Sequence, residues 1–148
     1  YRCIKTLSGK SSTSFKDTSV KPGKTYTYRI RGYISAKGKT YYSSYTPIQK
    51  TKLKMEAPKI KKATVLKKKK IRLTWKRDSK ADGYYIYRST SQKGSYKKAK
   101  TITKNKTIKR TDTDIKRGKT YYYKIRSYTK SFAWTKSSGY SAVVSAKP

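Results

Sequence analysis

Residues 117–128 read RGKTYYYKIRSY, and residues 22–33 read PGKTYTYRIRGY. In the later stretch, Tyr121, Tyr123 and Ile125 occupy every second position, and more polar residues stand between them. A period of two built from aromatic and β-branched side chains predicts a β-strand with one face on a core and the other in solvent. The glycine that precedes each stretch marks the turn into that strand.

The two stretches belong to a longer internal repeat. The sequence matches itself at an offset of 95 residues without a gap, from Tyr1 on Tyr96 to Tyr45 on Tyr140. We therefore expect one structural unit that occurs twice, as the C-terminal part of a module in residues 1–54 and as a complete module in residues 55–148. The join has no Gly/Ser run and predicts a short linker with limited freedom. We also expect the chain to be part of a larger protein.

The composition contains few of the aliphatic residues that usually form a hydrophobic core. The chain has 41 Lys and Arg against 6 Asp and Glu, a net charge of +35, and Ile, Leu, Val and Phe make up only about one residue in seven. Such a composition is typical of disorder. Sixteen Tyr residues can supply the missing interior, because a phenol ring buries a large apolar area while its hydroxyl stays near water.

Further period-two runs extend the strand prediction through the complete module. They are Ile71–Trp75 and Tyr84–Tyr87, and turn signals such as Asp82-Gly83 and Lys93-Gly94 separate the runs at short intervals. No stretch keeps a helical period. Several short antiparallel strands within about 92 residues predict an all-β, immunoglobulin-like two-sheet β-sandwich.

Four elements of the complete module, in order, resemble a fibronectin type III domain. They are Pro58 before the first strand, Leu73-Thr-Trp75, Gly83-Tyr-Tyr-Ile-Tyr-Arg88, and Ile115-Lys-Arg-Gly118-Lys-Thr-Tyr121. The Lys- and Tyr-rich sequence of the chain is similar to the sequences of tandem modules in exported surface proteins of Gram-positive gut bacteria. The resemblance implies a core ring at Trp75. It also implies a tyrosine corner at Tyr121, repeated at Tyr26, in which the ring hydrogen-bonds backbone upstream.

Two positions need a separate interpretation. Asp17 and Asp112 recur at the repeat offset just before the glycine turn, so we interpret them as caps that hydrogen-bond turn backbone. The strand position of Phe15 in the first copy is Arg110 in the second. Either this edge is more solvated in the complete module or the local register differs by one residue, and parity alone leaves both open.

The sequence argues against an enzyme and against a metal or cofactor site. It has no His and a single Cys, Cys3, so an imidazole base, a thiolate zinc site and an internal disulfide are excluded. The few carboxylates are scattered, and the surrounding lysines repel a dication such as Ca²⁺. No apolar run is long enough for a membrane span.

Two groups of residues are candidate ligand contacts. The first is Trp134 between Lys130 and Lys136, in a predicted long loop from Thr129 to Ser138 that often binds partners in the type III family. The alternative is that its rings close the hairpin against a neighbouring strand. The second group forms a predicted turn between the first two strands of the complete module and consists of Lys67, Lys68, Lys69 and Lys70.

The charge predicts the kind of partner. Like charges closer than the Debye length of about 8 Å repel each other, so such a surface favours an anionic surrounding such as teichoic acid or acidic glycans. Nucleic acid is the rival, but Lys outnumbers Arg, the charge is not confined to one stripe, and the fold is not a usual nucleic-acid reader.

These observations lead to a functional expectation. We expect a non-catalytic spacer or adhesion module, extracellular or at a bacterial cell surface, whose partners are neighbouring modules and anionic polymers. We expect no specific nucleic-acid partner and no membrane insertion. The alternatives are an accessory module of an exported glycoside hydrolase or peptidase, and a carbohydrate-binding module.

Overall fold

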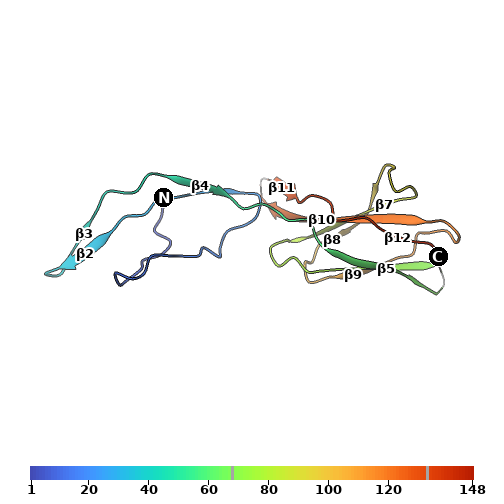
Figure 1. The fold of residues 1–148 in the computed structure, drawn as a ribbon, viewed down its shortest axis with the longest axis horizontal. Helices are drawn as coiled ribbons and strands as arrows, with labels where there is room; N and C mark the ends of the chain where they lie inside the picture. The colour runs from blue at the N-terminus through green and yellow to red at the C-terminus, as the bar shows by residue number, and fades with distance from the viewer. Residues whose placement is uncertain (68, 133) are drawn as a thin grey trace.

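The chain is an elongated all-β molecule. The computed structural model describes residues 1–67, 69–132 and 134–148, and all regular elements in these residues are strands. The hairpin of β2 (Tyr33–Ala36) and β3 (Lys39–Tyr42) lies at one end of the long axis and a sandwich lies at the other (Figure 1). No helix long and apolar enough to cross a membrane occurs in the described residues.

The second copy forms two antiparallel sheets. In the first sheet, β6 (Lys70–Trp75) lies between β5 (Ile60–Leu66) and β9 (Lys109–Asp112). The second sheet consists of β8 (Lys97–Ile102), β7 (Gly83–Ser89) and β10 (Tyr121–Ser131), followed on the far edge of β10 by β11 (Trp134–Ser137) and β12 (Val144–Ala146). This arrangement confirms the predicted two-sheet, immunoglobulin-like sandwich.

The core lies between these sheets and is rich in tyrosine. It includes Trp75, which is 1% exposed, and Tyr123, which is 0% exposed, together with inward residues of β6, β7 and β10. The ring of Tyr84 meets Trp75 edge to face at 5.4 Å between centroids. The Tyr84 hydroxyl accepts a hydrogen bond from Asp78 N at 2.8 Å and donates to Asn105 O at 3.2 Å. The Tyr84 ring therefore fills the interior while its hydroxyl binds backbone at the rim of the core.

The close approach of two strands depends on Gly83 at the start of β7. A Cβ atom there would lie 2.0 Å from Ile102 O on β8 and 2.7 Å from the Tyr128 hydroxyl. Tyr128 lies over this position, and its hydroxyl donates to Ile102 O at 3.3 Å. Glycine is therefore required for packing, because any side chain would push β7 and β8 apart.

The first copy contains a two-part hairpin. It consists of β1 (Thr25–Tyr28) paired with β4 (Gln49–Lys52), and β2 (Tyr33–Ala36) paired with β3 (Lys39–Tyr42). These pairs reproduce the register of β10 with β12 and β11 at the offset of 95: Tyr26 faces Thr51 as Tyr121 faces Ala146. Residues 1–24 form no strand, and most large apolar side chains of this copy are exposed.

Two sequence expectations are decided by strand pairing. The long loop expected from Thr129 to Ser138 is wrong, because β10 continues to Ser131 and pairs directly with β11, which begins at Trp134. The pairs run without interruption from Tyr128 with Ser137 to Ser131 with Trp134. Arg110 lies on the edge strand β9 opposite Leu73, and its side chain is exposed. Of the two alternatives for that position, the solvated edge is therefore the one observed.

Candidate binding surfaces

The residues expected to be structural lie at the start of β10 and β1. The Tyr121 hydroxyl accepts a hydrogen bond from Lys116 N at 2.9 Å, and the Tyr26 hydroxyl accepts one from Lys21 N at 2.8 Å. The turn between donor and ring contains Gly118 with φ of 77°, a left-handed conformation that glycine adopts without strain. Both copies thus hold the ring over the same turn, although Tyr26 is only half-buried.

The two aspartates make the same two contacts. Asp112 Oδ1 accepts from Asp114 N at 3.1 Å, and its Oδ2 accepts from the Tyr123 hydroxyl at 2.8 Å. Asp17 Oδ1 accepts from Ser19 N at 2.8 Å, and its Oδ2 accepts from the Tyr28 hydroxyl at 3.0 Å. The two hydrogen bonds that Asp17 accepts from the Ser19 hydroxyl and the Ser19 backbone N lower the pKa of Asp17, with a smaller contribution from Tyr28. Each carboxylate therefore caps a turn and also ties it to the neighbouring strand.

Arg88 completes this network in the second copy. Its Nη1 lies 3.0 Å from Asp112 Oδ2 and its Nη2 lies 2.9 Å from Asp114 Oδ2. Burial alone would lower the pKa of Arg88, but the hydrogen bonds to Asp114 and Asp112 raise it. Burial, followed by the bond to Asp112, raises the pKa of Tyr123. Sequence reasoning missed Arg88, because its partners lie 24 and 26 residues away on facing parts of the sandwich.

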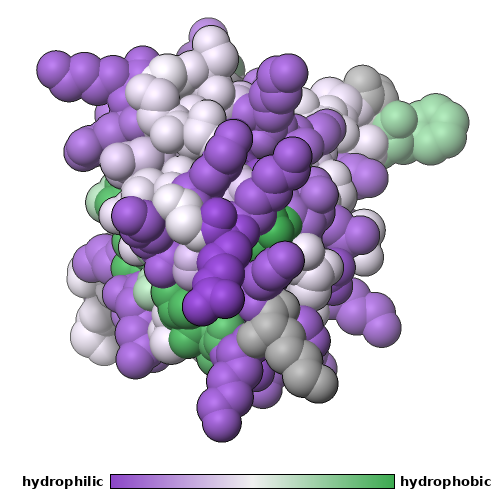
Figure 2. Space-filling view, turned by 90° about the vertical axis from the view of Figure 1, so that its right-hand side faces the viewer, coloured by the Kyte–Doolittle hydropathy of each residue, from purple (hydrophilic) through white to green (hydrophobic). Residues whose placement is uncertain are grey.

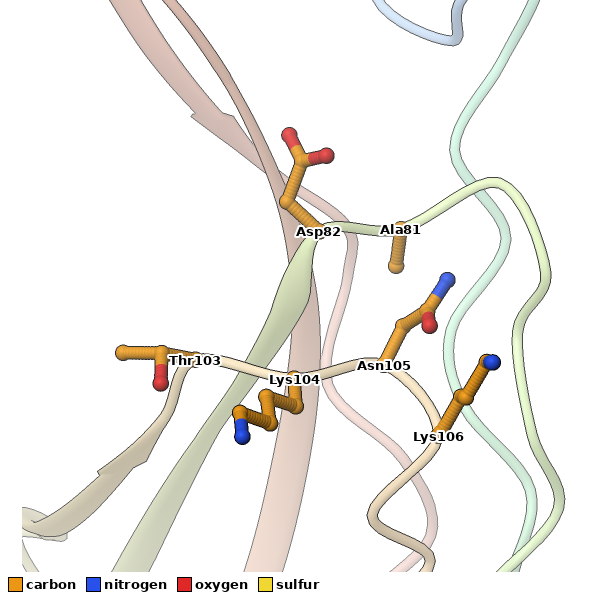
Figure 3. Close-up of a pocket in the computed structure, with 6 residues that line it drawn as sticks. All are labelled: Ala81, Asp82, Thr103, Lys104, Asn105 and Lys106. Carbon is orange, nitrogen blue, oxygen red and sulfur yellow. The ribbon is translucent and has the colours of Figure 1, made fainter.

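The described residues contain no group of three His, Cys, Asp or Glu side chains that could hold a metal ion. A hollow beside the start of β7 is lined by Ala81, Asp82 and residues 103–106 (Figure 3). Their side chains do not converge on one point: Lys104 and Asp82 point in different directions. Asp82 Oδ2 instead accepts a hydrogen bond from Lys130 N at 2.6 Å. The hollow offers no set of groups that could act together on a substrate.

The first group of candidate ligand contacts lies at the junction of the two copies. Trp134 is half-buried, with Lys136 Nζ 5.6 Å and Lys24 Nζ 5.7 Å from its ring centroid. Lys136 Nζ also donates to Gly23 O at 3.1 Å. Lys130 is exposed and lies over Tyr128 instead. The candidate indole is therefore flanked by lysines of both copies.

The second group lies elsewhere. The β5–β6 connection is at the end of the molecule that carries the C-terminus (Figure 1). Lys67 and Lys69 are in its turn, Lys70 begins β6, and Lys68 lies outside the described residues. The structure therefore does not bring the two groups of candidate contacts together.

A third surface was not expected from the sequence. On the outer face of the second copy, Lys124 Nζ lies 4.1 Å from the ring centroid of Tyr96 and 3.9 Å from that of Tyr140. The Arg126 guanidinium lies 4.7 Å from the Tyr140 ring, and Arg126 Nε donates to Ser138 O at 2.6 Å. We call these four residues, Tyr96, Lys124, Arg126 and Tyr140, the tyrosine–cation strip of the second copy.

The first copy has the same strip at the repeat offset. It consists of Tyr1, Arg29, Arg31 and Tyr45. Arg29 lies 4.2 Å from the Tyr1 ring and 3.8 Å from the Tyr45 ring, and Arg31 lies 4.9 Å from the Tyr45 ring. Arg29 and Arg31 lie between β1 and β2, and their alternation, taken at the offset of 95, could have revealed the strip from the sequence.

Hydroxyl side chains position the central tyrosine of each strip. Between β11 and β12, Ser138 Oγ accepts from Ser127 N at 3.0 Å and Ser141 Oγ accepts from Ile125 N at 2.9 Å. Tyr140 lies between these two serines in the chain. In the first copy, Ser43 and Thr46 bind the backbone in the same way, at 2.8 and 3.0 Å. These hydrogen bonds hold the segment beside β10 where regular strand pairing is interrupted.

The surface is cationic and few of its charges are neutralised within the chain. In the described residues, the salt bridges within 4.0 Å are the two of Arg88. Figure 2 shows hydrophilic side chains over most of the end face that it views, with small apolar areas between them. The charge of +35 is therefore left almost entirely to solvent and counter-ions.

No family model and no curated protein matches this chain. Among solved structures, it is similar to an Fn3-like protein from Clostridium thermocellum, with 26% sequence identity and a TM-score of 0.54. That match covers 64% of this chain and 94% of the Clostridium chain. The complete copy has the fibronectin type III fold.

Two larger proteins share this fold. A two-domain fibronectin type III segment of chicken tenascin matches with 17% identity and a TM-score of 0.56, over 82% of this chain and 65% of that one. A β-1,2-glucanase from Parabacteroides distasonis matches with 24% identity and a TM-score of 0.54. The match covers 76% of this chain but only 16% of the glucanase chain.

Proposed function

We propose that this chain is a non-catalytic spacer and adhesion region of a larger exported bacterial surface protein, with weak attraction to polyanions of the cell wall or of host glycans. The observation that carries the proposal is the excess of cations without carboxylate partners on a repeated type III fold. Domains of this fold are typically non-catalytic and commonly extracellular. A surface that repels itself is more stable when external anions surround it.

The spacer role draws support from the junction between the copies. Besides the Lys136 bond to Gly23, Ser127 Oγ donates to Glu56 O at 3.4 Å, so the linker is held against the second copy. Contacts of this kind limit bending and favour an extended arrangement of successive modules.

A salt series tests the polyanion attraction. The isolated chain is passed over immobilised teichoic acid, heparin and a neutral glycan at rising ionic strength. We expect retention on both anionic polymers at low salt, loss of retention as salt rises, and none on the neutral glycan. Retention that does not change with ionic strength, or no retention at all, contradicts the polyanion attraction and leaves only the spacer role.

One alternative is an accessory module of an exported glycoside hydrolase or peptidase. The observation that favours it is the glucanase match, in which a segment with this fold makes up a small share of an enzyme chain. The sequence of the parent protein decides between the two. A catalytic domain in the same chain supports the accessory role, and an array of repeats with a wall anchor supports the surface role.

A second alternative is a carbohydrate-binding module that stacks a neutral sugar on Trp134. Its observation is the half-buried indole near an exposed hairpin tip, where Phe132 is fully exposed. This alternative predicts that Trp134→Ala abolishes binding of a neutral oligosaccharide. Because Lys24 and Lys136 already lie near the ring, we expect the titration to be unchanged.

A further inference from the structure

We propose that the two tyrosine–cation strips are the contact sites for the polyanion, and that each takes a segment of an acidic glycan chain bearing sulfate or phosphate groups. This inference rests on the polyanion attraction of the proposed function and assigns it to particular residues. The alternative within that function is a diffuse attraction to which every exposed lysine contributes alike.

The strip cations are held in place before any ligand arrives. Lys124 Nζ is within 4.1 Å of two ring centroids, and Arg126 is fixed both by the Tyr140 ring and by Ser138 O. The Tyr140 ring is itself supported from β7 by Tyr87, edge to face at 5.2 Å. A free lysine or arginine loses side-chain freedom when it binds, and a cation already ordered by rings loses less.

Lys124 and Arg126 have no carboxylate partner among the described residues. The salt bridges of the described residues involve only Arg88, so neither Lys124 nor Arg126 lies within 4.0 Å of a carboxylate there. Arg126 uses Nε for Ser138 O, which leaves its terminal nitrogens as donors. Terminal guanidinium nitrogens suit the paired oxygens of a sulfate or phosphate group.

The arrangement of rings and cations in the strips suits an acidic glycan better than a nucleic acid. Nucleic acids bind aromatic strips by stacking bases on open ring faces. Here cations already lie over Tyr140 and Tyr45, so a base could stack only by displacing them. In the second copy, Lys124 and Arg126 alternate along β10, so they are about 6.8 Å apart along the backbone. This arrangement suits charges spaced along a glycan and offers no platform for bases.

The chain carries two strips, so one polyanion can contact it at two places. The strip occurs in both copies at the repeat offset, and β7 and β8 widen it in the second copy, where Lys98 Nζ lies 5.0 Å from the ring centroid of Tyr85. A long polyanion that reaches both strips binds the second one at high effective concentration. Weak single contacts can therefore add up to stable attachment.

The test compares variants of equal charge. Lys124→Ala/Arg126→Ala removes two strip cations, and Lys104→Ala/Lys106→Ala removes two exposed lysines of the β8–β9 loop. Heparin fragments and a glycerol-phosphate polymer are titrated as probes, with single-stranded DNA as the third. We expect the strip variant to bind both acidic polymers about threefold to tenfold more weakly than the control variant.

A variant that keeps the charge separates ordering from electrostatics. Tyr140→Leu leaves both cations but removes the ring between them, and Tyr140→Phe keeps the ring. We expect weaker binding for Tyr140→Leu and unchanged binding for Tyr140→Phe, with the folded state of each verified by circular dichroism.

Each outcome has a defined meaning. If both double variants lose the same binding affinity, or if Tyr140→Leu binds as well as the unchanged chain, the strips are not the contact sites. The attraction is then diffuse. No binding of the unchanged chain to any acidic polymer at low salt overturns the proposed function itself. Binding to DNA that is tighter than to heparin and to the glycerol-phosphate polymer, and that is lost in the strip variant, assigns the strips to nucleic acid and contradicts the acidic glycan. A loss on heparin alone or on the glycerol-phosphate polymer alone identifies sulfate or phosphate as the group bound.

Discussion

Replacement of Tyr123 by phenylalanine tests whether phenols can serve as core residues of a cationic chain. The substitution keeps a ring that is 0% exposed and removes the hydroxyl that donates to Asp112 Oδ2 at 2.8 Å. A hydrogen bond to a charged group contributes about 1.5–3 kcal/mol. Asp112 keeps its bonds from Arg88 and Asp114, so we expect a loss near the lower limit, about 1.5 kcal/mol.

The same substitution has a predicted effect at alkaline pH. Burial, and then the bond to Asp112, raises the pKa of Tyr123 above the ordinary value of 10.0, so the folded chain keeps a proton that the unfolded chain loses. This contribution to stability is fully present below pH 10 and falls as pH rises towards the folded-state pKa. Its slope is at most about 1.4 kcal/mol per pH unit, and Tyr123→Phe removes it.

The assay is urea unfolding followed by circular dichroism at pH 8 and at several values above pH 10. Deprotonation of the many lysines affects both proteins, so the comparison is the difference between the variant and the unchanged chain. Tyr41→Phe, at an exposed position of β3, is the control and should stay within about 0.5 kcal/mol. If Tyr123→Phe has the same unfolding free energy and the same alkaline slope as the unchanged chain, the hydroxyl contributes nothing to the core.

Three further predictions concern packing and the junction. Gly83→Ala should destabilise the second copy by about 1–3 kcal/mol or more, because the added Cβ meets backbone, whereas Gly139→Ala, with open space around it, should change the unfolding free energy by less than about 0.5 kcal/mol. Tyr121→Phe should cost about 0.5–1.5 kcal/mol in thermal or urea unfolding, because one turn N–H loses its acceptor. Lys136→Ala should leave that free energy nearly unchanged but free the junction by removing the bond to Gly23, so ¹⁵N relaxation should show the two copies tumbling more independently.

Much of the fold follows from patterns that are local in the sequence. Alternation within residues 117–128 predicts β10, and the offset of 95 predicts that β1 to β4 repeat the register of β10 with its partners. The tight hairpin after β10 was missed, because Phe132 and Trp134 resemble a loop tip in composition. Only the pairing of Ser131 with Trp134 shows that the strands continue.

The contacts that define the candidate surfaces depend on tertiary structure. The Arg88 bonds join β7 to the end of β9, and no periodicity within either strand predicts them. The strip needs Tyr140 beside β10, a position set by the Ser138 and Ser141 hydroxyls where strand pairing is interrupted. One of the two lysines near the Trp134 ring, Lys24 at 5.7 Å from the ring centroid, belongs to the other copy, so no pattern within one module predicts the contact.

The use of the few carboxylates explains why the outer face is left positive. Five of them accept hydrogen bonds from backbone or from Arg88 and tyrosine hydroxyls, namely Asp17, Asp78, Asp82, Asp112 and Asp114. They stabilise turns and the joins between strands, where a neutral side chain would leave donors unpaired. None of these contacts is with a cation of the strips, whose only ordered partners among the described residues are tyrosine rings and backbone carbonyls. Rings order a cation without cancelling its charge. The acidic residues thus stabilise the turns and strand joins of the fold, and the ordered positive charge faces outward. An external anion can lower the repulsion that remains there.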